Sequence, residues 1–246
     1  MSKNFELLTH VEADRELFRA VEKKTQPPAQ KCLSPRLGDV AREEVAKLVQ
    51  RIFLSSANGV ARRAVVFCGI EHGDGASWIC AQVARAVAEH GSNTVCAVDV
   101  SLRSPSLHGY LGAANRAGLG DAVRQAGPIR NFLEPGSLSN LWVLPAGLDA
   151  DPSVLLISDR FRERVAELRA EFDFLIFDAP PAAHSNDAAV LGRLLDGVVL
   201  VVGAGSTRRE TARKAKENLE KEQVRLLGTV LNGRSFPIPD ALYRRL

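Results

Sequence analysis

Apolar residues along the chain follow two alternating patterns. Short uncharged runs rich in β-branched residues predict buried strands near residues 64–69, 94–99, 141–145, 173–178, 197–203 and 226–231. Apolar residues at helical spacing predict helices near residues 39–54, 77–90, 118–126, 152–171, 185–195 and 207–222. Because strands and helices alternate, we predict an α/β fold with a doubly wound, mostly parallel sheet flanked by helices. Ligands of such sheets bind at the carboxyl ends of the strands.

The two ends of the chain depart from this alternation. Residues 4–22 place apolar side chains among charges and predict an amphipathic helix, and Pro27 and Pro28 mark a linker after it. We therefore expect an N-terminal helix and linker over residues 1–36, one α/β domain over residues 37–234 and a short tail over residues 235–246.

Composition narrows the class of protein. The 246 residues carry a formal net charge of +3, and basic and acidic residues are interleaved, which argues against nucleic-acid binding. Cys32, Cys68, Cys80 and Cys96 lack the spacing of a zinc site, so we expect buried free thiols and a reducing compartment. The start resembles no signal peptide, and the most apolar stretch is interrupted by charges. We predict a cytoplasmic protein that reaches the inner membrane only through a partner.

A glycine-containing loop, His72 to Ser77, lies between the first predicted strand and the helix that follows it. In a Walker A loop, glycines let backbone N–H groups surround phosphate oxygens, a lysine reaches the β- and γ-phosphates, and Ser or Thr binds Mg²⁺. Here Ala76 holds the lysine position, whereas Ser77 remains. Many α/β crossovers use a Gly-x-Gly turn only to reverse the chain. The candidate phosphate-binding residues are Gly73, Asp74, Gly75, Ala76 and Ser77.

Carboxylates end two of the predicted strands, at Asp99 and Asp178. Because the carboxyl ends of parallel strands meet at one edge, we expect both carboxylates to lie near Ser77. Magnesium is usually held by one or two carboxylates together with substrate phosphates, so Ser77, Asp99 and Asp178 form a candidate metal site. Taken alone, each aspartate could instead cap a helix or face solvent in a loop.

These motifs carry a resemblance to a known family. The glycine loop is followed by Val98–His108, by the Leu144–Gly147 segment, by Phe174–Pro181, by Asp196–Val202 and by Gly228–Asn232. In this order and over roughly residues 40–234, the chain resembles the bacterial polysaccharide-biosynthesis tyrosine autokinases, or BY-kinases. BY-kinases belong to the MinD/ParA-like deviant-Walker P-loop ATPases.

The resemblance implies ATP or ADP and Mg²⁺ as cofactors. It makes Asp99 the first acid of the Walker A′ motif and Asp178 the Walker B acid, both catalytic, and it matches Asn232 to an adenine-contacting asparagine. The predicted helix over residues 39–54 resembles the family's oligomerisation helix, which implies a homo-oligomer. Its Glu-x-x-Arg-x-x-Arg pattern is only partly kept, as Glu44, Lys47 and Gln50.

Three departures from the family pattern bear on activity. Ala76 replaces the lysine, Ser101 replaces the second acid of Walker A′, and the only tyrosines are Tyr110 and Tyr243 in place of a C-terminal cluster. Losing a charged hydrogen bond to phosphate should cost about 1.5–3 kcal/mol of binding. If that donor also stabilises transition-state charge, the rate should fall by roughly 10²–10³.

Two cations near the loop admit two interpretations. Arg103 could lend its guanidinium to the phosphates and His72 lies in the loop itself, but we favour a structural Arg–carboxylate contact and an exposed loop histidine.

Three functions remain open. The leading hypothesis is a degenerate BY-kinase-like protein with weak or lost ATP binding. It would act in exopolysaccharide or capsule biosynthesis as a cytoplasmic regulatory partner of a membrane chain-length or export protein. The second is an active ATP-dependent tyrosine autokinase or ATPase with a substitute cation. The third is a MinD/ParA-type positioning ATPase.

Overall fold

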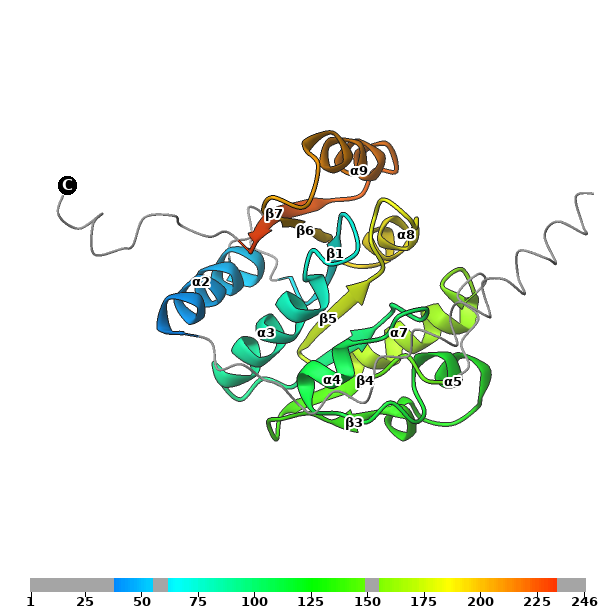
Figure 1. The fold of residues 1–246 in the computed structure, drawn as a ribbon. Helices are drawn as coiled ribbons and strands as arrows, with labels where there is room; N and C mark the ends of the chain where they lie inside the picture. The colour runs from blue at the N-terminus through cyan, green and yellow to red at the C-terminus, as the bar shows by residue number, and fades with distance from the viewer. Residues whose placement is uncertain (1–37, 55–61, 149–154, 234–246) are drawn as a thin grey trace, which may run out of the picture. The chain divides into compact units, whose positions relative to one another are not determined.

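The computed structural model describes residues 38–54, 62–148 and 155–233 (Figure 1). The predicted N-terminal helix and linker, Cys32, and the tail with Tyr243 lie outside these ranges. The strands are β1 (Ala64–Gly69), β2 (Val95–Asp99), β3 (Glu134–Pro135), β4 (Leu141–Leu144), β5 (Phe174–Ala179), β6 (Val198–Gly203) and β7 (Leu226–Asn232). The helices are α2 (Asp39–Val49), α3 (Ala76–Glu89), α4 (Leu107–Leu111), α5 (Leu119–Arg124), α7 (Asp159–Glu171), α8 (Asp187–Leu194) and α9 (Arg209–Lys221). A π-helical turn, η1 (Gln50–Leu54), extends α2, and a 3₁₀ turn, η2 (Ile129–Phe132), precedes β3.

The strands form one seven-stranded sheet in the order β3-β4-β2-β5-β1-β6-β7. All neighbouring strands are parallel except β3 and β4, which pair antiparallel. Every residue of β1 and β2 is buried, which explains why these strands consist of apolar runs without alternation. The predicted α/β fold with a mostly parallel sheet is confirmed.

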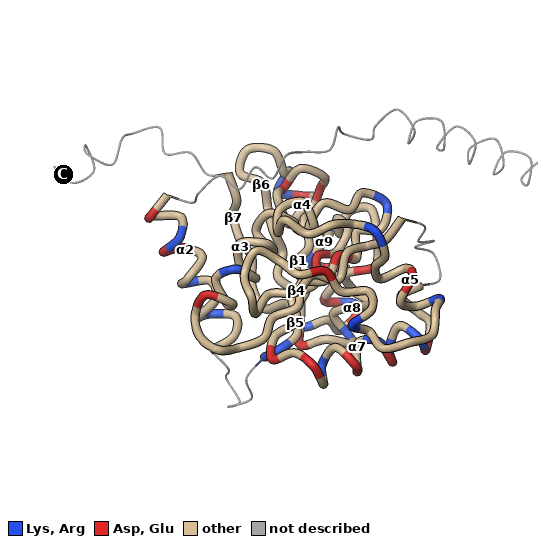
Figure 2. Tube along the Cα trace, turned by 90° about the horizontal axis from the view of Figure 1, so that it is seen from below, with Lys and Arg blue, Asp and Glu red and all other residues tan. Residues whose placement is uncertain are grey.

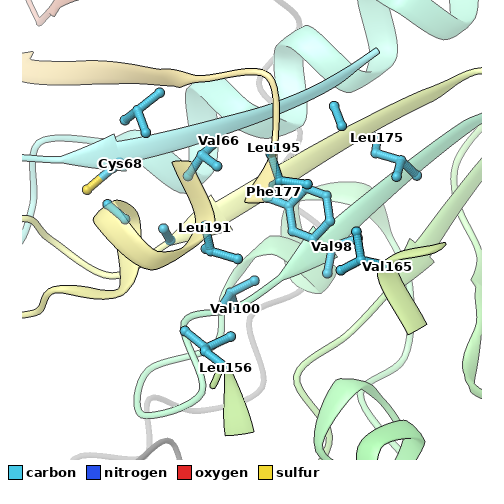
Figure 3. Close-up of a cluster of buried hydrophobic side chains, with 14 of the residues drawn as sticks. Val66, Cys68, Val98, Val100, Leu156, Val165, Leu175, Phe177, Leu191 and Leu195 are labelled. Carbon is cyan, nitrogen blue, oxygen red and sulfur yellow. The ribbon is translucent and has the colours of Figure 1, made fainter. Parts of the chain in front are cut away.

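Helices cover both faces of the sheet. Alternate residues of each strand point to opposite faces, so Val65 and Phe67 of β1 pack with α2, α3 and α4, whereas Val66 and Cys68 pack with α7 and α8. Figure 3 shows part of the second face, where Phe177 of β5 lies among aliphatic side chains from neighbouring elements. The sheet is therefore the middle of three layers.

Some elements differ from the prediction. The helix expected from residue 152 begins at Asp159, because Ser158 caps it: the Ser158 hydroxyl oxygen accepts the Phe161 N–H at 3.2 Å. Residues 152–154 of that expected helix lie outside the described ranges. The short elements α4, η2 and β3 were not predicted, since each is too short to show a periodic pattern.

Arg164 of α7 is a buried cation within the second face. Its guanidinium donates to the backbone carbonyl oxygens of Ala122, Gln125 and Gly127 at 2.7–2.8 Å, and it forms an ion pair with Glu167 at 2.7 Å. The side chain of Arg164 is only 1% exposed. Arg164 thus satisfies the carbonyl groups at the end of α5 and in the loop after it, as a planar five-donor group can.

Surface charges and thiols agree with the sequence. Figure 2 shows charges of both signs along α7, where Arg160 pairs with Glu163 and Arg162 pairs with Asp159. Cys68, Cys80 and Cys96 are buried free thiols, as predicted. Within the described residues, no helix combines the length and the apolar content that a membrane crossing requires.

Candidate functional site

Three loops meet at the carboxyl edge of the sheet. Strands β1, β5 and β2 are parallel neighbours, and their register pairs Asp99 of β2 with Asp178 of β5. The glycine loop follows β1 at this same edge, and α3 begins directly after it at Ala76. Both predicted carboxylates therefore end their strands beside the loop that carries Ser77.

The backbone of the glycine loop depends on its two glycines. Gly73 and Gly75 have φ angles of +90° and +83°, a left-handed region that side chains disfavour. A Cβ atom at Gly75 would also collide with the amide nitrogen of Asn232. The glycines therefore allow the sharp turn from β1 into α3 and the close approach of β7.

Asp74 holds the loop together through its buried side chain. One of its carboxylate oxygens accepts the N–H groups of Ile70 and Glu71 at 3.0 and 2.8 Å, and the other accepts the hydroxyl proton of Thr207 at 2.6 Å. The side chain of Asp74, predicted as part of the phosphate site, is thus committed to the loop and to the segment after β6. The backbone of Asp74 is engaged as well, since its N–H donates to the Glu71 carbonyl oxygen at 3.4 Å and its carbonyl oxygen accepts the Asn232 amide at 2.8 Å.

A pocket of about 410 Å³ opens above the three strand ends. Its walls come from the glycine loop, from the loop after β2 and from the loop after β5, and they include Gly73, Gly75, Ala76 and Ser77. A volume of a few hundred Å³ is typical of small-molecule sites. The pocket occupies the position where open α/β sheets bind ligands, at the carboxyl ends of their strands.

Asp99 lies beneath the pocket and is fully buried. Its carboxylate accepts three backbone N–H groups, from Ser101, Ser106 and Leu107, at 3.0–3.1 Å. Burial raises the pKa of Asp99 to about 7, although the three N–H donors act in the opposite direction. The loop after β2 thus wraps around this carboxylate.

Asp178 is buried equally deeply but lacks such donors. Among the residues that the structure describes, neither of its carboxylate oxygens has a hydrogen-bond partner of normal geometry. Burial and the nearby charge of Asp99 raise the pKa of Asp178 well above its usual range, whereas the adjacent Ser77 hydroxyl lowers it. An acidic group with two unused oxygens fits an Mg²⁺ ion, which takes oxygen ligands.

The donor set suits Mg²⁺ more than a metal that needs a complete protein cage. The described ranges contain no cluster of three or more His, Cys, Asp or Glu side chains that could hold a metal ion. Magnesium keeps several waters and relies on substrate phosphates for further ligands. Ser77 and Asp178 therefore fit the group that the sequence predicts when a phosphate ligand completes it, whereas the Asp99 carboxylate already accepts three backbone N–H groups.

The interpretation favoured for Arg103 is wrong. In the described part of the chain its guanidinium forms no ion pair and no hydrogen bond, and it lies exposed on the pocket wall. His72 is exposed, as expected, but it also stacks on His184 from the loop after β5. Asn232 does not line the pocket, and its amide nitrogen donates to the Asp74 carbonyl oxygen at 2.8 Å. An adenine contact by Asn232 would use its amide oxygen or the second N–H of its amide group.

Sequence reasoning missed the segment after β6. The hydroxyl oxygen of Thr207 accepts the Gly203 N–H at 3.0 Å while its proton goes to Asp74. A Cβ atom at Gly203 would lie 2.6 Å from a carboxylate oxygen of Asp74. A glycine at the carboxyl end of a predicted strand was the only available signal for this close approach.

Comparisons with known proteins agree with this geometry. The model of the family described as "ATPase MipZ" matches residues 63–202. Tyrosine-protein kinase YwqD of Bacillus subtilis (strain 168) is 34% identical over 165 residues, which cover 67% of this chain and 69% of that protein. Tyrosine-protein kinase wzc of Salmonella typhi is 27% identical over 169 residues, 68% of this chain but only 23% of that longer protein.

A solved structure with the same fold is the chimerical protein CapA2B2. It superposes with a TM-score of 0.75 at 26% sequence identity, over 83% of this chain and 88% of that one. The family match covers more than half of the chain, and the glycine loop and both strand-end carboxylates lie within it. The chain therefore belongs to the MipZ/ParA-like P-loop ATPases and, among them, to the bacterial tyrosine kinases known as BY-kinases.

Proposed function

We propose that this chain binds an adenine nucleotide with Mg²⁺ weakly and acts by binding, as a degenerate BY-kinase. It would work in capsule or exopolysaccharide biosynthesis as a cytoplasmic regulatory partner of a membrane chain-length or export protein. The observation that carries the proposal is the combination of an intact glycine turn, Ser77 and two buried carboxylates with Ala76 at the lysine position.

The groups that the site retains would bind the nucleotide and Mg²⁺, whereas the missing lysine would serve phosphoryl transfer. Ser77 and Asp178 would hold Mg²⁺, and Asp99 lies beside them in register. The ion supplies positive charge against the phosphate oxygens. Backbone N–H groups at the start of α3 bind phosphate whatever side chain follows. The missing lysine would chiefly have stabilised charge on the transferred phosphoryl group, so binding survives its loss better than transfer does.

The relatives support the biological setting. The named relatives are tyrosine kinases, and the resemblance places such kinases in polysaccharide biosynthesis with a membrane partner. A homo-oligomer built through α2 is part of the same proposal, although Lys47 pairs with Glu43 and Glu44 of its own helix at 2.9 and 3.0 Å.

Nucleotide titration tests the proposal directly. ATP and ADP should bind weakly with Mg²⁺, and phosphate release should be slow or absent. Ala76→Lys should tighten ATP binding by about 10- to 100-fold, the equivalent of about 1.5–3 kcal/mol for a charged hydrogen bond. Ala76→Met, which has similar length and no charge, should not. Equal affinities of folded Ala76→Lys and Ala76→Met would show that the loop is not a phosphate site.

One observation favours the second candidate, an active kinase with a substitute cation. Arg103 lies on the pocket wall and forms no ion pair with any described residue. Mass spectrometry after incubation with Mg²⁺-ATP distinguishes the two functions. Stoichiometric phosphate on Tyr110 or Tyr243 that disappears in Asp99→Asn would establish the kinase, whereas an unmodified chain supports the degenerate protein.

A further inference from the structure

Two histidines from separate loops stack face to face at the pocket. His72 belongs to the glycine loop and His184 to the loop after β5, and both line the pocket. Their ring centroids lie 5.2 Å apart, and their planes differ by 15°. In the described ranges neither imidazole forms an ion pair or a hydrogen bond, so the ring nitrogens are available to a ligand.

The pocket offers few other positive charges. Among its described lining residues, only Arg103, His72 and His184 can carry one. The acidic groups of the lining are Glu71 from the glycine loop, Asp74, and Asp187 at the start of α8. Since Asp74 is internally hydrogen bonded, a polyphosphate that enters here meets Arg103 and the histidine pair as its cationic partners.

A stacked imidazole pair responds to an anion in a defined way. Imidazole gains a proton within the physiological pH range, and a nearby anion favours the charged form. Two parallel imidazolium rings 5.2 Å apart would repel each other. A bound di- or triphosphate supplies negative charge that offsets this repulsion.

We propose that His72 and His184 form a proton-dependent phosphate clamp that takes the place of the missing lysine. The proposal rests on the proposed nucleotide site and specifies how that site obtains its positive charge. Binding of a nucleoside di- or triphosphate draws protons onto the pair, and affinity therefore rises as the pH falls. A monophosphate carries less charge and gains less from the clamp.

Other titrating groups at the site have the opposite effect. Asp99 and Asp178 lie beneath the pocket, and an Mg²⁺ ion bound there displaces their protons. The terminal phosphate also loses its proton on meeting a cation. These groups release protons and weaken binding at low pH, whereas the imidazoles take protons up. Proton uptake on binding therefore comes from the histidines, and proton release comes from the carboxyl groups and the phosphate.

Calorimetry in buffers of different ionisation enthalpy measures this exchange. We titrate the full chain with ATP, ADP and AMP in the presence of Mg²⁺ at pH 6, 7 and 8. The wild type should take up more protons on binding ATP than a variant without the two histidines, because the carboxyl groups and the phosphate release protons in both. One proton linked to the histidines should strengthen ATP binding by up to about tenfold for each unit that the pH falls. AMP should show little dependence on pH.

Variants assign the effect to the pair. His72→Gln and His184→Gln should each reduce proton uptake, and the double variant should leave only the proton release of the carboxyl groups and the phosphate. His184→Arg carries a permanent charge, so it should bind ATP at pH 8 at least as tightly as the wild type does at pH 6. His90→Gln, at the exposed end of α3, should behave as wild type. All three positions are exposed loop or helix-end sites, so melting temperatures should not change.

The outcomes separate this proposal from the one on which it rests. If the histidine variants bind ATP with wild-type affinity and proton exchange while Ala76→Lys still tightens binding, the clamp is wrong and the nucleotide site stands. If neither the wild type nor Ala76→Lys binds nucleotide at any pH, both proposals are wrong.

Discussion

Replacing Asp178 with Asn should stabilise the protein when Mg²⁺ is absent. Asp178 is fully buried, neither of its oxygens has a hydrogen-bond partner among the described residues, and Asp99 lies beside it in register. In the unfolded chain this carboxyl group ionises freely in water. In the folded chain it is held either as an uncompensated buried charge or in its protonated form, and both states cost free energy at neutral pH.

The neighbouring carboxyl group indicates the size of this cost. The pKa of Asp99 rises from 3.8 to about 7, and at about 1.4 kcal/mol for each pKa unit this corresponds to about 4 kcal/mol at neutral pH. Asp178 lacks the three N–H donors that partly offset burial at Asp99. A buried Asn amide without partners costs about 1–3 kcal/mol. The net gain should be about 2 kcal/mol, or about 4–8 °C in melting temperature for a chain of this length.

Thermal unfolding at pH 8 with EDTA measures the effect, and Asp99→Asn is the matched control. Both variants remove one buried carboxylate from adjacent strands. In Asp99→Asn, however, the new amide N–H₂ group faces at least one of the three N–H donors, so this variant should gain less stability than Asp178→Asn. Equal shifts in the two variants, or a lower melting temperature for Asp178→Asn, would refute the reasoning.

Magnesium provides the second readout. If Asp178 holds the ion, Mg²⁺-ATP should raise the melting temperature of the wild type but not that of Asp178→Asn, because a ligand stabilises only the state that binds it. Wild-type-like stabilisation of Asp178→Asn by Mg²⁺-ATP would remove Asp178 from the metal site.

Three further predictions concern stability, and urea unfolding checks each. Without Mg²⁺, stability should fall by up to about 4 kcal/mol as the pH rises from about 4 to 7, because Asp99 keeps its proton over this window only in the folded state; a flat profile would contradict this. Arg164→Met should cost about 3–5 kcal/mol by leaving carbonyl groups unsatisfied, whereas Arg162→Met on the exposed side of the same helix should cost about 0.5 kcal/mol or less. Thr207→Val should cost about 1–3 kcal/mol by leaving one carboxylate oxygen of Asp74 without a donor, and Thr207→Ser should restore most of it.

The fold was predictable where burial is uniform. Strands β1, β2 and β6 are covered on both faces, so their sequences are uncharged runs with clear ends. The position of Asp99 and Asp178 followed from the same fact, since parallel strands end at a common edge. The start of α7 was misplaced because Ser158 ends the preceding segment through a local hydrogen bond, which an apolar pattern does not record.

Contacts between distant segments were not predictable from the sequence. From the sequence alone, Arg164 would be assigned to the exposed face of its helix. Its burial depends on its contact with α5, which only the structure shows. From the sequence alone, Asp74 would be assigned to a loop with no distant contact. In the structure it accepts a hydrogen bond from Thr207, which is 133 positions away. The sequence around His184 indicates no functional role, because the proposed role depends on stacking with His72 across the pocket. In each case the partner is set by strand order and not by local sequence.

The position of each group explains why binding and phosphoryl transfer can separate in this chain. Backbone N–H groups at the start of α3 bind phosphate through the local conformation, which Gly73 and Gly75 secure and Ala76 does not disturb. Phosphoryl transfer also needs positive charge on the oxygens of the migrating group, and a side chain must supply what the metal does not. In this pocket that charge must come from Arg103, from the histidine pair or from Mg²⁺ on Asp178. Because none of these occupies the lysine position at the helix start, we propose that the site keeps the groups that would hold a nucleotide, whereas the catalytic step would lack its main cation.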